Sequence, residues 1–341
     1  MLAIDQGGTK TAALLGDDRG NIFGVGYGTG ACFFAVGHDR AISCVEQALS
    51  DLANRYGLTD WRQVGIERVS AGMSGANWPD ECEAMEKRLN AHFRVDNAYV
   101  INDCVPAMLG GTTAPNAVVL CAGSGFNSAV RVDGEIVWIY NNYIEAFDAG
   151  GSGIAQRALV SVFRTDTKMG PPTSLRERAL EFFGYPDVLS LLLDYDRRRM
   201  KQQVKDFAYC VDEEAVRGDA VARAVQMEFG RSVSRYASAA IRKYGLENEH
   251  VDVVLSGGAF KAKTGLSNQG VRDKLARVCP NVRVVDARLE PVVGAYLMGL
   301  ERARGGSLDV DTLERVERSV RSFNLIRSAK SEPDGSRIKE V

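Results

Sequence analysis

The sequence contains no apolar run long enough to cross a bilayer, and its first residues lack the basic flank and hydrophobic stretch of a signal peptide. Its net charge is only −2, which is too near neutral for a surface that attracts nucleic acid or an anionic membrane. These absences predict a cytoplasmic protein with no nucleic-acid partner and no membrane partner.

A disulfide framework is absent as well. The seven cysteines are scattered, odd in number and never arranged as a CxxC pair, which is typical of reduced thiols.

The chain is long enough, and contains enough apolar residues, to form folded domains. Its 341 residues exceed what one core usually serves, and the 45% of hydrophobic residues argues against disorder. We therefore expect two folded domains.

A pattern near the start of the chain occurs twice. The stretch "AIDQGGTKTAALLGDDRGNI" reads as a strand, a glycine turn and a hairpin, and "VLCAGSGFNSAVRVDGEIV" reads as a weaker copy. One fixed offset places Gly8 on Gly125, Thr11 on Ser128 and Ala12 on Ala129. An internal duplication is the simplest explanation, and a chance match at one offset is the alternative.

The rest of the chain alternates strands and helices, which predicts mixed sheets with helices on their faces. Strands are expected at 68–72, 98–103, 116–123, 251–258 and 282–287, and helices at 38–57, 79–93, 105–111, 152–163, 291–304 and 308–323. The expected domains are 1–113 with the returning helix 291–304, 114–290 with a helical insert at 173–243, and 305–341 as a helix and loose tail.

Glycine turns of this kind can bind an anion, because they let backbone N–H groups point together and come close to it. Two such turns from duplicated domains, facing across a cleft, would hold the two ends of a polyphosphate. Asp5 directly precedes the first turn and is placed to hold Mg²⁺ through water. The alternative is two ordinary hairpins that use glycine as a turn residue.

Five segments in order resemble the sugar kinase–heat-shock protein–actin superfamily. They are "DQGGTKT", "VINDC", "CAGSGFN", "VLSGGAFK" and "EPVVGAYLMGL". Within it, "SGANWPDE", "DAGGSGIAQRAL" and "GPPTSL" resemble the BadF/BadG/BcrA/BcrD-type ATPase family, which includes the N-acetylglucosamine kinases. The resemblance implies an α/β fold of two ribonuclease H-like (actin-like ATPase) domains flanking a nucleotide cleft, with ATP and Mg²⁺ as cofactors.

The resemblance also assigns roles to glycine-rich positions. The phosphate-binding residues would be Gly7, Gly8, Thr9 and Lys10 in the first domain and Gly123, Ser124 and Gly125 in the second. The adenosine-binding residues would be Gly257, Gly258 and Ala259. Alternatively, Lys10 is a solvated surface lysine, and Gly257, Gly258 and Ala259 form a plain strand-to-helix turn.

Asp103 is the candidate catalytic base. It follows an apolar strand, so it is expected at the carboxyl edge of the sheet, where ligands of open α/β sheets bind. In the kinases that this sequence resembles, the acidic residue of "ND" or "TD" accepts the proton of the attacking hydroxyl and lies against the substrate. The alternative is that Asp103 caps the short helix that follows.

The sugar-binding residues are less well matched. Asn127 corresponds to a sugar-contacting asparagine of the N-acetylglucosamine kinases, or else is a hairpin residue without a ligand. Asp148 corresponds to the aspartate of their "GDEGS" only with a one-residue gap, so it is a sugar ligand or an ordinary loop residue. Cys32 stands where those kinases have a sugar-binding asparagine, and a thiol cannot replace an amide's donor and acceptor.

The sequence thus predicts an ATP-dependent kinase that phosphorylates a hydroxyl of an amino sugar such as N-acetylglucosamine or glucosamine. A small-molecule sugar is the expected partner, and a homodimer is an assembly that the sequence allows. One alternative is an ATPase that activates a partner enzyme through an iron–sulfur cluster, with Cys121 as a ligand. The other is a non-catalytic sugar sensor.

Overall fold

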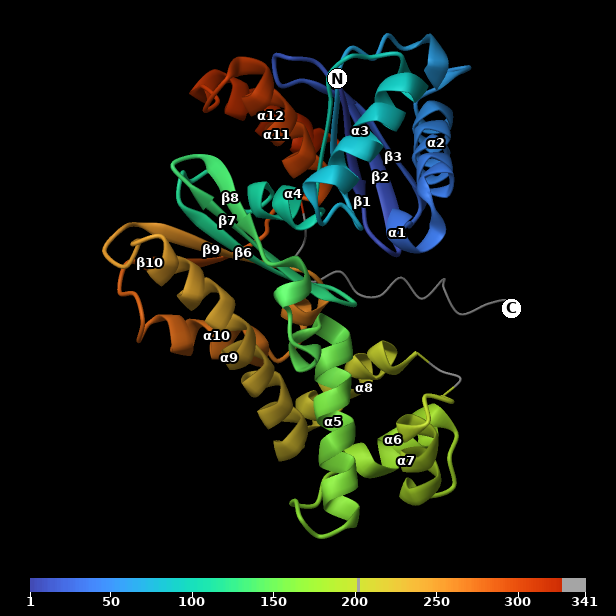
Figure 1. Ribbon diagram of the computed structural model, residues 1–341, viewed down its shortest axis with the longest axis vertical. Helices are drawn as coiled ribbons and strands as arrows, with labels where there is room; N and C mark the ends of the chain where they lie inside the picture. Colours follow the sequence, from blue (N-terminus) through green and yellow to red (C-terminus); the bar gives the residue numbers. More distant parts are fainter. Residues whose placement is uncertain (201–202, 327–341) are drawn as a thin grey trace. The chain divides into compact units, whose positions relative to one another are not determined.

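The computed structural model describes residues 1–200 and 203–326 (Figure 1). The chain forms two compact units. Unit 1 contains Met1–Pro115, Asp133–Ile139 and the chain from Asp286 onward, and unit 2 contains Asn116–Val132 and Tyr140–Val285. The sequence predicts a loose tail at the C-terminus. It falls on residues 327–341, which lie outside the described part of the chain.

The sheet of unit 1 has the strand order β3-β2-β1-β4-β5. Its strands are β1 (Leu2–Gln6), β2 (Lys10–Gly16), β3 (Ile22–Thr29), β4 (Val69–Met73) and β5 (Ala98–Ile101). The first three form an antiparallel meander, and β4 and β5 run parallel to β1. The carboxyl ends of β1, β4 and β5 therefore meet at one edge.

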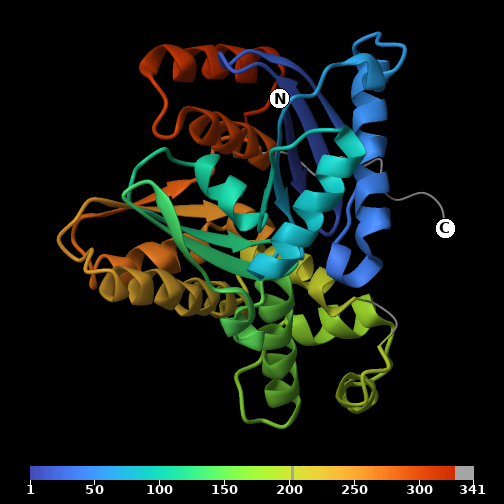
Figure 2. The same cartoon turned by 45° about the horizontal axis from the view of Figure 1, so that its top comes forward.

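Helices cover both faces of this sheet (Figure 2). They are α1 (Phe33–Val36), α2 (His38–Arg55), α3 (Pro79–Phe93), α4 (Cys104–Leu109), α11 (Pro291–Arg304) and α12 (Val310–Ser322), with a 3-10 turn η1 at Trp61–Gln63. One face packs on α2 and α3, and its core includes Leu49 and Met85. The other packs on α11 and α12, and its core includes Tyr296 and Val316.

A second five-stranded sheet repeats this topology. Its strands are β6 (Ala117–Ala122), β7 (Phe126–Val132), β8 (Glu135–Ile139), β9 (Val251–Ser256) and β10 (Val282–Asp286). Their order is β10-β9-β6-β7-β8, with β7 antiparallel and β9 parallel to β6. Two sheets with one strand order support the predicted duplication. The second hairpin turns at Asp133 and Gly134, both with positive φ, as the "VDGE" signal predicts.

Unit 2 also contains the helical region drawn from green to orange in Figure 1. Its helices are α5 (Gly150–Asp166), α6 (Leu175–Phe183), α7 (Val188–Asp196), α8 (Phe207–Arg217), α9 (Ala220–Lys243) and α10 (Leu266–Leu275). Short 3-10 turns occur at Asn141–Tyr143, Ala146–Asp148, Val204–Asp206 and Gly258–Lys261. Helices α6, α7, α8 and α9 lie within the range 173–243. Across the described ranges, no helix has the length and apolar character needed to span a membrane.

The last described helix, α12, belongs to the core of unit 1. Asp309 caps it by accepting a hydrogen bond from the Thr312 N–H, at 2.7 Å, and Val316 and Val320 are buried. Charges of both signs lie on its outer side, where Glu317 pairs with Arg288 at 2.9 Å.

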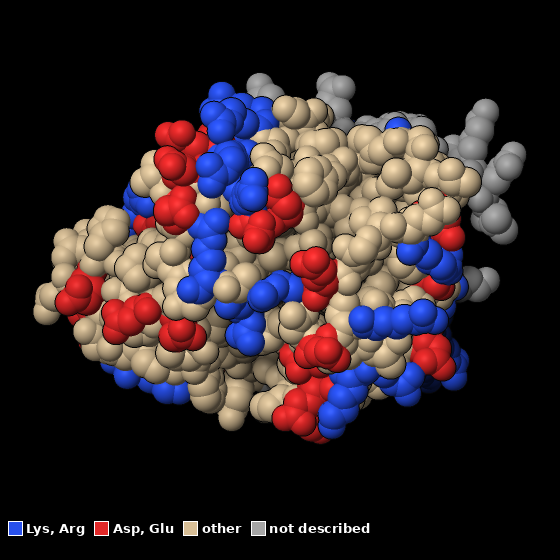
Figure 3. Space-filling model, turned by 90° about the horizontal axis from the view of Figure 1, so that it is seen from above, with Lys and Arg blue, Asp and Glu red and all other residues tan. Residues whose placement is uncertain are grey.

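The surface carries charges of both signs. Figure 3 shows Lys and Arg side chains lying among Asp and Glu side chains on the face that it draws.

Candidate active site

The first glycine loop connects β1 to β2. It closes with a hydrogen bond from the Gly7 N–H to the Lys10 carbonyl, at 3.0 Å. Gly30 packs directly against the loop, because a Cβ on Gly30 would lie 2.3 Å from the Thr9 backbone. A Cβ on Gly8 would meet no atom of the described chain within 4 Å. The loop is therefore fixed on one side and open at Gly8.

Asp103 lies beside this loop. A Cβ built on Gly7 would be 3.8 Å from the Oδ2 atom of Asp103. Asp5 is also at this edge, since its strand partner on β4 is Gly72, and a Cβ on Gly72 would be 3.3 Å from the Asp103 Cα. The structure thus brings Asp5, the first glycine loop and Asp103 together in unit 1.

The side chain of Asp103 does not cap α4. Asp103 directly precedes α4 but makes no side-chain cap hydrogen bond. The Asn102 Oδ1 atom instead accepts a hydrogen bond from the Cys104 N–H, at 3.0 Å. The alternative assignment of Asp103 as a helix cap is therefore wrong, because the preceding residue makes that bond.

Burial sets the protonation of Asp103. Removal of the carboxylate from water raises its pKa to about 6, although a hydrogen bond from its own backbone N–H acts in the opposite direction. A carboxylate with a pKa in this range is still ionised at neutral pH and is a stronger base than an ordinary aspartate. This combination suits a group that accepts a proton from a hydroxyl.

Lys10 begins β2 at the end of the first loop. Its ammonium group lies 3.4 Å from a Glu290 carboxylate oxygen and 3.9 Å from the centre of the Tyr27 ring. About half of the side chain is exposed, at 48%. The lysine is therefore not fully solvated, because its ammonium group contacts Glu290 and Tyr27. Its role in phosphate binding stays a prediction.

The second glycine loop is held by the start of α5. The Gly151 N–H donates to the Gly123 carbonyl at 2.9 Å, and both the N–H and the hydroxyl of Ser152 donate to the Ser124 carbonyl, at 3.3 and 3.1 Å. Gly150 has a φ of +56°, and a Cβ there would lie 2.1 Å from the Gly125 carbonyl oxygen. The sequence predicted this helix from residue 152 onward and did not reveal its contact with the loop.

The proposed adenosine segment touches the same loop. Gly257 has a φ of +99°, and a Cβ on it would lie 2.2 Å from the Ala122 carbonyl oxygen and 2.8 Å from the Gly123 nitrogen. Gly258 and Ala259 follow in the 3-10 turn Gly258–Lys261. Only glycine allows both this conformation and this close approach. The structure thus brings residues 123–125 and 257–259 together in unit 2.

Asn127 lies on β7, one strand position from the loop. Its Oδ1 atom accepts hydrogen bonds from the N–H groups of Ser128 and Asn141, at 2.8 and 3.0 Å, and its Nδ2 group donates to the Asn141 side chain at 3.3 Å. These bonds fix the turn at residues 141–143. The Asn127 side chain is predicted to contact the sugar. It would have to do so while its amide makes these hydrogen bonds.

Asp148 is completely buried and bonded to two arginines. Arg157 on α5 donates to its Oδ1 atom at 3.1 Å, and Arg235 on α9 pairs with its Oδ2 atom. Arg235 also pairs with Glu145 at 2.8 Å. No sequence pattern pointed to these arginines. Sugar binding by Asp148 stays a prediction, and both of its oxygens already have partners.

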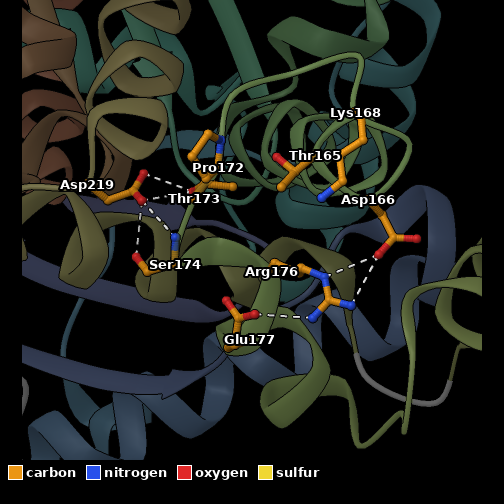
Figure 4. A pocket seen from close by; sticks show the side chains of 9 residues that line it. All are labelled: Thr165, Asp166, Lys168, Pro172, Thr173, Ser174, Arg176, Glu177 and Asp219. Carbon is orange, nitrogen blue, oxygen red and sulfur yellow. Dashed lines mark hydrogen bonds and ion pairs between the residues drawn. The ribbon is translucent and has the colours of Figure 1, made fainter.

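The family-like segment "GPPTSL" lines a pocket of about 570 Å³ in unit 2 (Figure 4). Its polar walls bond mostly to one another. Asp219 accepts hydrogen bonds from the Thr173 hydroxyl and the Ser174 N–H, at 2.9 and 2.8 Å, while Arg176 bonds to Asp166. The segment therefore joins the starts of α6 and α9.

No group of three or more His, Cys, Asp or Glu residues suited to a metal occurs within 1–200 and 203–326.

Two matching five-stranded mixed sheets, each with a glycine loop after its first strand in the chain, define an actin-like ATPase fold. The chain belongs to the BadF/BadG/BcrA/BcrD ATPase family, which it matches over residues 2–299. The predicted family and fold class are confirmed.

Known relatives agree with this assignment. The chain is 22% identical over 317 residues to an N-acetyl-D-glucosamine kinase of Dictyostelium discoideum, covering 88% of this chain and 97% of that protein. A Chromobacterium violaceum structure assigned as an N-acetylglucosamine kinase has a TM-score of 0.64 at 20% identity, over 87% of this chain and 97% of its own. A Streptomyces griseus glucokinase solved with glucose and AMPPNP has a TM-score of 0.56 at 16% identity, over 90% and 99%.

Proposed function

We propose that the protein is an ATP-dependent kinase that phosphorylates a hydroxyl of an amino sugar such as N-acetylglucosamine or glucosamine. The observation that carries the proposal is the position of Asp103. Its carboxylate is partly buried, makes no helix-cap bond and lies beside the first glycine loop. The relatives named as N-acetylglucosamine kinases support the choice of acceptor.

In the proposed reaction, Asp103 accepts the proton of the sugar hydroxyl as the hydroxyl oxygen attacks the γ-phosphorus of ATP. The bond between the γ-phosphorus and its bridging oxygen breaks, and ADP leaves. Phosphoryl transfer depends mainly on positioning and on neutralising charge. The glycine loops at 7–10 and 123–125 would supply backbone N–H groups to the phosphates, and residues 257–259 would bind adenosine.

We also propose Mg²⁺ as the cofactor that accompanies ATP. Mg²⁺ keeps several waters and is usually bound through one or two carboxylates and the substrate phosphates. The Asp5 carboxylate, at the loop end of β1, fits that role through water. When bound, the ion would neutralise developing phosphate charge, and it would leave proton transfer to Asp103.

The direct test is an ADP-release assay with N-acetylglucosamine, glucosamine and glucose. The panel is needed because Cys32, at the start of α1, replaces the asparagine expected in the sugar site. Wild type should phosphorylate at least one amino sugar, and Asp103→Asn should lower its turnover by about 10²–10⁴-fold. Asp96→Asn, an exposed aspartate of the same unit, is the control and should keep full activity. ATP hydrolysis without any phosphorylated sugar would contradict the proposal.

Three further expectations remain proposals with simple measurements. A homodimer is tested by analytical ultracentrifugation, and a cytoplasmic location by fractionation of the producing cells. The lack of a nucleic-acid or membrane partner is tested by gel-shift and vesicle-sedimentation assays. None of these outcomes changes the kinase proposal.

A further inference from the structure

Strand β5 is the edge strand of its sheet, and its free side is bound by side chains from α3. The Ala98 N–H donates to the Asn90 Oδ1 atom at 2.8 Å, and the Val100 N–H donates to the Glu86 Oε1 atom at 2.9 Å. Two residues further, the Asn102 side chain donates to the Asn77 Oδ1 atom at 2.9 Å. Side chains from the 77–90 segment thus fix every second residue between 98 and 102.

Asn102 uses both ends of its amide. The Nδ2 group bonds to Asn77, and the Oδ1 atom caps α4 through the Cys104 N–H. The residue is only 3% exposed, so these bonds form away from water and define one orientation. Because Asn102 makes the cap, the next residue, Asp103, keeps its carboxylate for other contacts.

Asn77 is itself fixed. Its backbone N–H donates to the Glu81 Oε2 atom at 2.8 Å, and the Trp78 N–H donates to the same oxygen at 3.0 Å. Glu81 lies in the first turn of α3, and Gly75, with a φ of +101°, turns the chain into this loop. A continuous set of hydrogen bonds therefore runs from α3 through Asn77 to Asn102, which is the residue before Asp103.

We propose that Asn77 and Asn102 are positioning residues that hold Asp103 against the first glycine loop. The role assigned to Asp103 rests on the proposed kinase function. Neither asparagine needs to touch the substrate, since each acts by fixing the chain that bears the base. Small displacements of a catalytic group can cost about 10²-fold in rate.

The test compares three variants of the full-length protein. Asn77→Leu keeps the size of the side chain but removes the acceptor, whereas Asn77→Asp retains an acceptor. Asn90→Leu removes the equivalent bond at the far end of β5 and is the matched control. We expect Asn77→Leu to lower kcat by about 10- to 100-fold with KM for ATP within about twofold, Asn77→Asp to restore most of kcat, and Asn90→Leu to lower Tm while kcat stays near wild type.

A second readout does not depend on turnover. With ¹³C-labelled aspartate, the Asp103 carboxyl resonance, assigned by its loss in Asp103→Asn, should shift or broaden in Asn77→Leu and stay in place in Asn90→Leu. This change would support the positioning role even if no sugar were phosphorylated, so the two proposals can fail separately. An unchanged Asp103 resonance in a folded Asn77→Leu protein would overturn the inference, as would equal losses of kcat in Asn77→Leu and Asn90→Leu.

Discussion

Asp103 directly follows Asn102, which caps α4, and its own carboxylate makes no cap bond. Its burial raises the pKa to about 6. The base must be ionised to accept a proton, so kcat/KM for the sugar should rise with pH through about 6 and level off above it. A pH profile of kcat/KM for the sugar measures this. A flat profile from pH 5 to pH 8 would remove Asp103 as the base.

The same burial has a cost in stability. The folded state binds the Asp103 proton more tightly than the unfolded state. The contribution of this residue to the free energy of unfolding therefore decreases as the pH rises from about 4 to about 6. Asp103→Asn should therefore be more stable than wild type at pH 8, by on the order of 2 kcal/mol, and nearly equal to it at pH 4. Urea unfolding at both pH values gives the comparison. A variant less stable than wild type at pH 8 would show that the carboxylate makes stabilising bonds.

Individual residues show where prediction from sequence stops. Asp103 and the loop glycines could be chosen as candidates because each residue type accompanies a local pattern, either the end of a strand or a turn. The arginines that bond to Asp148 could not, since Arg157 and Arg235 reach it from separate helices. The cap made by Asn102 was missed for a similar reason: adjacent Asn and Asp are both good caps, and only the packed backbone decides between them.

At the scale of elements, the sequence predicted most strands and helices, because periodicity and turn residues agree. Helix α2 ends at Arg55, and Gly57 follows with a φ of +69°, as expected of a C-terminal glycine. Helix α3 begins with Pro79 in its first turn. The sequence did not reveal that α5 begins at Gly150 against the second glycine loop, because that start depends on a contact between distant segments.

The two kinds of glycine at the first loop predict different defects. Gly8→Val should fold normally, since its Cβ meets nothing within 4 Å, but should weaken ATP binding by at least about tenfold by filling the space of a phosphate. Gly30→Val is the matched variant. Its Cβ would lie 2.3 Å from the Thr9 backbone, so the loop itself should be displaced and Tm should fall. Calorimetric titration with ATP and thermal unfolding separate the two effects. Normal ATP affinity in folded Gly8→Val would contradict the loop's role.

At the scale of the whole molecule, unit 1 includes residues beyond the family match, which ends at residue 299. Leu325 is fully buried in the core with Val316 and Val320, and its carbonyl accepts a hydrogen bond from the Glu290 N–H at 3.0 Å. The segment after the family match is therefore part of the structure of unit 1.

This packing predicts a large effect from a change near the C-terminal end. Leu325→Ala should lower the free energy of unfolding by about 2–5 kcal/mol, as expected for a buried leucine that leaves a cavity. Val310→Ala, at a position that is 70% exposed on α12, should change it by less than about 0.5 kcal/mol. Urea unfolding of both variants provides the measurement. Equal and small effects would mean that the end of the chain does not contribute to the core.

The division of unit 1 between the two ends of the chain has a consequence during synthesis. In unit 1, Met1–Pro115 is made before unit 2, whereas α11 and α12, which cover one face of its sheet, are made after unit 2. All of unit 2 is made in between, as a segment interrupted by Asp133–Ile139. Since domains generally fold as units as they emerge, unit 2 can fold on the nascent chain before unit 1 is complete. Until α11 and α12 have emerged, strands β1–β3 present an uncovered apolar face, and such transiently exposed surface is prone to aggregation and is what chaperones bind.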